Sequence, residues 1–151
     1  MTPRVPLLLT RKGIEAVAHF TCPARQISST FNFIVDTGSE VSLLAWEDAA
    51  KVDIEVDSLP SYDRPMAGFG GRAEVKHVSD MCCVHLTFDD GKMVTVDLPD
   101  GILVWRPSRR KTQRQNPVHS VSILGRDFLL SSGFTLFINL SKKQYYLERE
   151  D

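Results

Sequence analysis

The stretch FIVDTGS, residues 33–39, carries the most information about how this chain folds. Three apolar residues run into a carboxylate, Asp36, which Thr37, Gly38 and Ser39 follow. The apolar run is typical of a buried β-strand, and a carboxylate at the end of a strand is held in one place. Glycine lets backbone or ligand approach closely, and the neighbouring hydroxyls can orient the acid through hydrogen bonds. The stretch therefore predicts an Asp mounted for catalysis.

Short apolar runs, several of them alternating with a period of two, predict a mostly β domain around this stretch. The expected strands cover residues 31–35, 73–78, 84–88, 94–98, 134–140 and 144–148. The sequence Asp89-Asp90-Gly91 predicts the turn of one hairpin, and residues 141–143 predict the turn of a second, terminal hairpin. Helix signals are few, and only two short helices are expected, over residues 44–51 and over residues 126–132 before Gly133.

A length of 151 residues, with 42% hydrophobic and 25% charged residues, predicts one packed domain over residues 1–151. Within it we expect an N-terminal arm with the first strands over residues 1–25. We also expect residues 104–120 to form a basic loop or insertion, because the segment 105–120 carries five basic residues, two prolines and no acid.

With a net charge of -1, the chain as a whole has no electrostatic attraction to nucleic acid or to an anionic membrane. The basic segment is interpreted as a solvated loop in preference to a phosphate-binding one, and no apolar run approaches membrane-spanning length. Three cysteines, two of them adjacent, make a poor disulfide framework. We therefore expect a reducing, cytoplasmic location and neither a nucleic-acid nor a membrane partner.

The run Asp36-Thr37-Gly38-Ser39 resembles the signature of the retropepsin-like, or retroviral-type, aspartic proteases. Two further segments match this family in order and approximate spacing. The glycine-rich run Gly68, Phe69, Gly70 and Gly71 resembles the tip of the family's flap, the hairpin that closes over bound peptide. Residues 121–130, with Gly125-Arg126, resemble the family's second conserved block. The resemblance covers roughly residues 31–140.

The resemblance implies a closed, single-lobe retropepsin-like β barrel with one or two short helices, and with terminal strands paired at a dimer interface. It implies that Arg126 pairs with an acid just after the signature, where Glu40 stands in this chain. It also implies that Thr37 braces the catalytic turn and that the flap contacts the substrate, for which Phe69 is the best candidate.

Aspartic proteolysis needs two carboxylates that share one proton: one activates water and the other polarises the peptide carbonyl. The chain has no second Asp followed by a hydroxyl residue and glycine, since Asp90-Gly91 and Asp100-Gly101 lack the hydroxyl. The second Asp36 must come from another copy, which predicts a two-fold homodimeric endopeptidase that needs no cofactor. Its activity should favour acidic to near-neutral pH. An extended peptide or protein segment is the expected substrate, and the basic loop or the N-terminal arm is a candidate self-processing site.

Two other functions compete with this interpretation. A catalytically silent module of the same fold would dimerise or bind peptides and keep Asp36 for structure. An unrelated β-barrel that binds an anionic partner through the basic loop ranks third. A zinc site among His77, Cys82, Cys83 and His85 is set aside in favour of structural packing, because successive strand residues point to opposite faces. We expect no metal.

Overall fold

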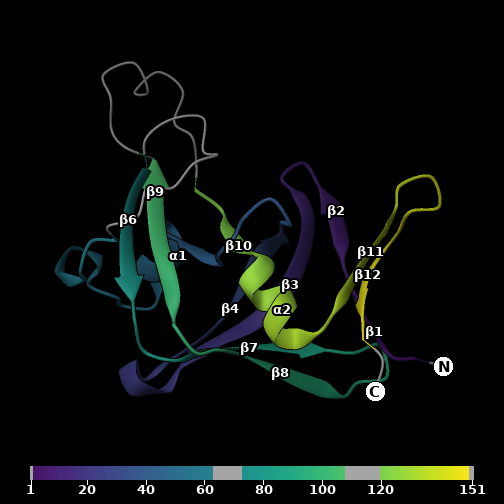
Figure 1. Ribbon diagram of the computed structural model, residues 1–151, viewed down its shortest axis with the longest axis horizontal. Helices are drawn as coiled ribbons and strands as arrows, with labels where there is room; N and C mark the ends of the chain where they lie inside the picture. Colours follow the sequence, from purple (N-terminus) through teal and green to yellow (C-terminus); the bar gives the residue numbers. More distant parts are fainter. Residues whose placement is uncertain (1, 63–72, 108–119, 150–151) are drawn as a thin grey trace.

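The computed structural model describes residues 2–62, 73–107 and 120–149 (Figure 1). The helical segments are α1 (Trp46–Lys51), α2 (Arg126–Ser132) and the 3-10 turns η1 (Pro23–Arg25) and η2 (Val56–Ser58). The strands are β1 (Arg4–Pro6), β2 (Leu8–Thr10), β3 (Gly13–Cys22), β4 (Ile27–Val35), β5 (Leu43–Ala45), β6 (Ala73–Val78), β7 (Cys82–Thr87), β8 (Met93–Leu98), β9 (Ile102–Pro107), β10 (Ser122–Leu124), β11 (Thr135–Asn139) and β12 (Gln144–Glu148). The expectation of a mostly β chain with two short α-helices is confirmed for the described residues.

A nine-stranded mixed sheet forms the body of the molecule, in the order β6-β9-β5-β10-β4-β3-β7-β8, with β2 paired to β3. Most pairs are antiparallel, but β10 runs parallel to β4 and β5 runs parallel to β9. A barrel closes only when its first and last strands hydrogen-bond to each other. No described strand joins β6 to β8. The described strands therefore form an open sheet, and the expected closed barrel is not found among them.

The register of the central strands explains a small second core. Ile123 of β10 lies opposite Ile34 of β4 on one side and Leu43 of β5 on the other. Leu43 in turn lies opposite Leu103 of β9. Paired residues in adjacent strands point to the same face of the sheet. These side chains therefore form one apolar row, which Trp105 and Val75 extend into a cluster separate from the main core.

The main core lies on the other face of the central strands. Phe33 of β4, Phe20 of β3 and Phe128 of α2 are each almost fully buried there. Burying an aromatic side chain of this size stabilises the fold by about 1.5–3 kcal/mol. Helix α2 also lies against β8 and β10, as Figure 1 shows, so it covers the strand that runs beside β4.

Local turn signals placed several elements well. Helix α2 has the expected bounds and ends at Gly133, which takes a left-handed conformation with φ 71°. The β7–β8 hairpin turns through Asp89-Asp90-Gly91, and the β11–β12 hairpin turns where residues 141–143 were expected to form the turn. Strand β9 runs through Pro107, so the first residues of the segment expected as a basic loop belong to a strand. Residues 108–119 of that segment lie outside the described residues.

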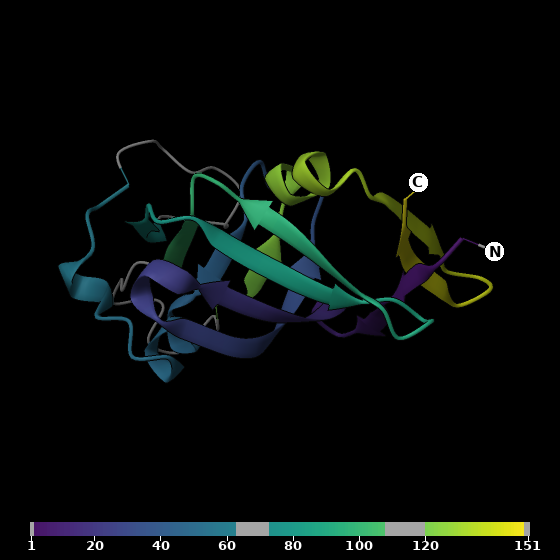
Figure 2. The same ribbon diagram turned by 90° about the horizontal axis from the view of Figure 1, so that it is seen from below.

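A separate three-stranded sheet, β1-β12-β11, holds both ends of the described chain together at one end of the molecule (Figures 1 and 2). Arg4 lies opposite Glu148 in this sheet and forms an ion pair with it at 2.8 Å. The terminal strands were expected to pair at a dimer interface, but here β1 and β12 pair with each other inside one chain. Among the described residues, no helix has the length and apolar character needed to span a membrane.

Candidate active site

Asp36 follows the last residue of β4 and is locked in a tight turn. The Asp36 N–H donates to the Leu124 carbonyl at 3.0 Å, which extends the β4–β10 ladder by one bond. The Gly38 N–H donates to Asp36 Oδ1 at 2.8 Å, and the Ser39 N–H donates to the Asp36 carbonyl at 3.2 Å. Together these bonds form an Asx turn, which fixes the carboxylate relative to the sheet. The Asp lies at a strand end as expected, but a backbone N–H orients its carboxylate, because the Ser39 hydroxyl donates to the Val41 carbonyl at 2.7 Å instead.

The glycine of the turn leaves room for the carboxylate. A Cβ added to Gly38 would stand 3.0 Å from Asp36 Oδ1, tighter than ordinary van der Waals contact. Thr37 and Gly38 are exposed and Asp36 is half-buried, so one side of the carboxylate faces outward. An activated water needs such an open side.

Strand β10 and the start of α2 support the turn from behind. The Arg126 N–H donates to the Ser39 carbonyl at 2.8 Å, and the Asp127 N–H donates to the Glu40 carbonyl at 3.2 Å. A Cβ on Gly125 would meet the carbonyl oxygens of Val41 at 2.6 Å and Ser39 at 2.7 Å. Only glycine permits this approach, which explains why Gly125 stands where the second segment meets the turn.

The carboxylate of Asp127 ties the same two segments together. It accepts the Ser42 N–H at 3.0 Å, the Ser42 hydroxyl at 2.7 Å and the Phe128 N–H at 2.7 Å. The Ser42 Oγ atom in turn accepts the Gly125 N–H at 3.0 Å. Ser42 is almost fully buried. Buried polar groups that satisfy each other in this way hold one arrangement firmly.

The expected ion pair between Arg126 and Glu40 does not form in this chain. None of the ion pairs between described residues joins these two side chains, and both are exposed. Backbone hydrogen bonds and the Asp127 carboxylate join the two segments instead. An exposed pair of this kind contributes little stability, so its absence does not weaken the turn.

The expected flap residues Gly68, Phe69, Gly70 and Gly71 lie outside the described residues, in the segment 63–72. The residues that border this segment, Tyr62 and Ala73, both pack against the small apolar cluster around Ile123. The Tyr62 N–H donates to the Val75 carbonyl at 3.0 Å, so the two ends of the segment are held close to each other.

The cysteines are buried and carry no disulfide. The Cys82 thiol donates to the Asp80 carbonyl, and the Cys83 thiol contacts Asp97. Burial, with the neighbouring Cys22 thiol, raises the pKa of Cys82, and burial together with the hydrogen bond to Asp97 raises the pKa of Cys83. A raised pKa favours the neutral thiol, which is a weaker nucleophile than the thiolate. Within the described residues no three His, Cys, Asp or Glu side chains gather as a metal site.

Ser42 and Asp127 are the supporting residues that the sequence did not reveal. An acid in the first turn of a helix is a recognisable signal, and Asp127 stands in the first turn of α2. Nothing in the local sequence marks Ser42 as its partner, because the two residues are 85 positions apart.

No protein-family model matches this chain, and no curated protein sequence matches it. A retropepsin-like aspartic protease from Rickettsia conorii matches in structure with a TM-score of 0.56 at 19% sequence identity, covering 97% of this chain and 91% of that one. The EIAV protease complexed with the inhibitor HBY-793 matches with a TM-score of 0.43 at 19% identity, covering 82% of this chain and 91% of that one. The first likeness shows that this chain has the retropepsin-like fold.

Proposed function

We propose that this chain, which has the retropepsin-like fold, is one half of an aspartic endopeptidase that is active as a homodimer. The observation that carries the proposal is the turn of Asp36. A carboxylate at the end of a buried strand is held by the Gly38 N–H and by backbone bonds to β10 and α2, and it keeps one open side. Such a rigid, partly open acid is the form that general acid–base chemistry needs.

In the proposed dimer, Asp36 of each copy meets at the two-fold axis. One carboxylate is ionised and takes a proton from water, which attacks the carbonyl of an extended peptide. The other is protonated and donates its hydrogen to that carbonyl oxygen. Two carboxylates this close share one proton, because both cannot ionise readily. Thr37 lies at the exposed tip of the turn. In the proposed dimer it braces the partner's turn.

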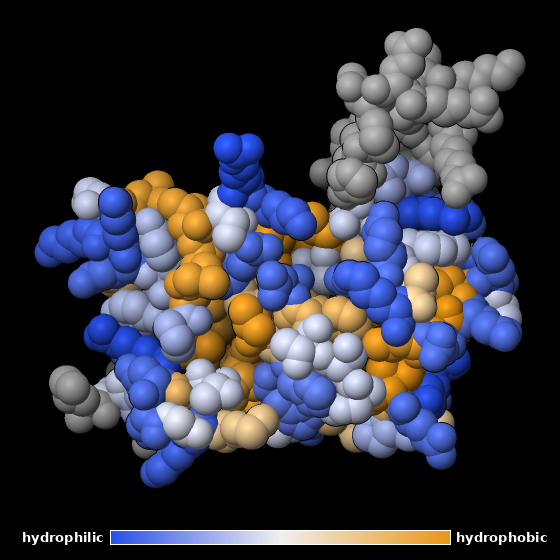
Figure 3. Space-filling view, turned by 180° about the vertical axis from the view of Figure 1, so that it is seen from behind, coloured by the Kyte–Doolittle hydropathy of each residue, from blue (hydrophilic) through white to orange (hydrophobic). Residues whose placement is uncertain are grey.

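The exposed apolar side chains of the terminal sheet support dimerisation. Phe137, Ile138 and Leu140 of the β11–β12 hairpin region are exposed, and Phe137 stacks on Tyr146 with ring centroids 4.6 Å apart. Apolar surface is visible at the end of the molecule that carries this sheet, on the left in Figure 3. Apolar surface of this kind favours a protein partner, and a second copy would bury it.

Peptide-library cleavage, read by mass spectrometry across acidic to neutral pH, tests the proposal. The wild type and the variants Asp36→Asn and Asp90→Asn are assayed at a concentration where light scattering detects a dimer. Asp90 also precedes a glycine but lies in the β7–β8 turn, so Asp90→Asn is a matched control. Cleavage by the wild type and by Asp90→Asn, but not by Asp36→Asn, is expected. A dimer that cleaves nothing would overturn the proposal in favour of a catalytically silent binding module.

Self-processing at the N-terminal arm or basic segment and a cytoplasmic location stay predictions. Mass spectrometry of the protein after prolonged incubation measures self-processing directly. A new terminus in the wild type that Asp36→Asn lacks would establish it.

A further inference from the structure

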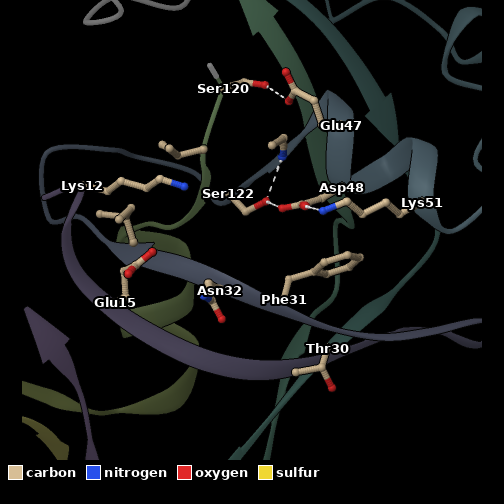
Figure 4. A pocket seen from close by; sticks show the side chains of 13 residues that line it. Lys12, Glu15, Thr30, Phe31, Asn32, Glu47, Asp48, Lys51, Ser120 and Ser122 are labelled. Atoms are coloured by element: carbon tan, nitrogen blue, oxygen red, sulfur yellow. Dashed lines mark hydrogen bonds and ion pairs between the residues drawn. The ribbon is translucent and has the colours of Figure 1, made fainter. Parts of the chain in front are cut away.

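A cavity of about 450 Å³ opens beside β4, where β10 begins (Figure 4). Strand β10 pairs with β4 only opposite residues 33–35, so the preceding part of β4 has no β10 neighbour. Helix α1 faces this gap and contributes Glu47 and Asp48 to the cavity wall. Strand β3 contributes Glu15, and β4 contributes Asn32. The volume lies in the range of about 300–1,000 Å³ that small-ligand sites occupy.

Glu15 is the unusual residue of this cavity. It is only 8% exposed, yet its carboxylate makes no hydrogen bond and no ion pair with any described residue. Every fully buried side-chain oxygen among the described residues has a hydrogen-bond partner. The Glu15 carboxylate has none among these residues, so it is not fully enclosed, and it opens to the cavity that Glu15 lines. Burying a charged group without a partner is costly. A cation bound in the cavity would supply the partner that Glu15 lacks.

The other acids of the cavity wall already have partners. Glu47 accepts the Ser120 hydroxyl, and Asp48 accepts the Ser122 hydroxyl at 2.6 Å and lies 3.5 Å from the Lys51 ammonium. These bonds hold both carboxylates at the wall, as Figure 4 shows. The remaining cation of the wall, Lys12, is exposed and forms no ion pair with a described residue. Three carboxylates against two ammonium groups give the cavity wall a net negative charge, which favours a positively charged ligand.

Ile34 links the cavity to the proposed catalytic turn along β4. Ile34 and Val121 line the cavity, and both also pack against the apolar cluster that Tyr62 and Ala73 border. Ile34 stands two residues before Asp36 on the same strand, a separation of about 7 Å. A side chain of a peptide bound at Asp36 can therefore reach the cavity.

We infer that this cavity is a subsite for a lysine or arginine side chain of the peptide substrate, in which Glu15 selects the positive charge. The inference rests on the proposed endopeptidase function and names its substrate class. The ammonium or guanidinium group of the peptide pairs with the Glu15 carboxylate, and the Asn32 side chain, exposed on β4, offers a further acceptor. Lys12 opposes the incoming cation by charge repulsion.

Binding to the full-length Asp36→Asn protein tests this subsite without any requirement for turnover. The probes are pairs of blocked octapeptides that differ only by lysine or norleucine at one position, with each position scanned in turn. Dissociation constants are measured by calorimetry. In at least one position the lysine peptide is expected to bind about tenfold more tightly, the effect of one charge-assisted hydrogen bond.

Three variants in the Asp36→Asn background sharpen the test. Glu15→Gln is expected to abolish the preference for lysine, because glutamine keeps the shape and loses the charge. Glu55→Gln, an exposed residue that does not line the cavity, is the matched control and should keep the preference. Lys12→Ala should strengthen lysine binding about threefold, because it removes the repulsion. Thermal unfolding of each variant verifies that it is folded.

Several outcomes overturn the inference: equal binding of lysine and norleucine peptides at every position, no binding of any peptide, or a preference that survives Glu15→Gln. Binding of n-butylamine as tight as that of the lysine peptide would assign the cavity to a small free amine. A separate assay of wild-type cleavage on the same peptides reports on the proposed function. Lysine-selective binding without any cleavage would contradict the enzyme and leave the cation site standing.

Discussion

Two aspartates stand at the junction of β4 and β10, and their surroundings differ sharply. Asp127, at the start of α2, accepts three hydrogen bonds from Ser42 and Phe128. Asp36, at the end of β4, accepts one side-chain hydrogen bond, from the Gly38 N–H. A carboxylate whose oxygens are all engaged holds structure, whereas one with free acceptor capacity can bind water or exchange a proton. We therefore expect Asp127 to stabilise the fold and Asp36 to act in catalysis.

The largest expected effect comes from Asp36→Asn. Asparagine keeps an oxygen that can accept the Gly38 N–H, so the free energy of unfolding should change by less than about 0.5 kcal/mol. Peptide cleavage should fall at least a thousandfold, roughly the upper range for loss of a general acid or base. Urea unfolding and a cleavage assay measure the two quantities. A variant with full cleavage would break the assignment.

Asp127→Ala should show the opposite pattern. It leaves the buried Ser42 hydroxyl and N–H without their acceptor, which should lower the free energy of unfolding by about 2–4 kcal/mol. Any loss of cleavage should be smaller than for Asp36→Asn once corrected for the folded fraction. Urea unfolding measures the change, with the exposed Asp57→Ala as a control that should stay within about 0.5 kcal/mol. An unfolding curve of Asp127→Ala that overlays the wild type would remove the contrast.

Gly125→Ala tests how closely the two regions are packed. The new methyl group would stand 2.6–2.7 Å from the carbonyl oxygens of Val41 and Ser39, so the backbone has to shift. A loss of about 1–3 kcal/mol in unfolding free energy is expected, with reduced cleavage because the turn of Asp36 moves. Gly91→Ala is the matched control: its φ is positive but its Cβ would meet nothing within 4 Å. It should cost about 1 kcal/mol and leave cleavage unchanged, and an equal effect on cleavage by both variants would contradict the prediction.

The two regions also differ in how far the sequence revealed them. The Asp36 turn could be predicted from the sequence, because an apolar run, an acid and a glycine are neighbours in the chain, and local hydrogen bonds complete the turn. The bounds of α2 could be predicted for the same reason, since the signal that ends the helix, Gly133, directly follows it in the chain. The role of Asp127 could not be predicted from the sequence, because its partner Ser42 is 85 residues away in the chain.

Predictions that depend on contacts between distant parts of the chain failed for the same reason. Whether the sheet closes depends on whether β6 reaches β8, and strand periodicity says nothing about which strands become neighbours. The Arg126–Glu40 ion pair does not form, and backbone hydrogen bonds join the two segments without it. Glu15 was hidden because the cavity that it faces exists only once β3, β4, β10 and α1 are assembled.

The smallest expected effect concerns the buried thiol of Cys82 on β7. It appears as a dependence of stability on pH. Burial and the neighbouring Cys22 raise the pKa of this thiol above its ordinary value of 9.0, so the unfolded chain loses the proton at a lower pH than the folded protein. The stability that depends on the neutral thiol is therefore complete below about pH 9 and declines as pH rises beyond it. Urea unfolding at pH 8 and pH 10 should show a steeper loss for the wild type than for Cys82→Ala, by at most about 1.4 kcal/mol per pH unit. Parallel losses in the two proteins would mean that Cys82 titrates as freely in the folded chain as in the unfolded one.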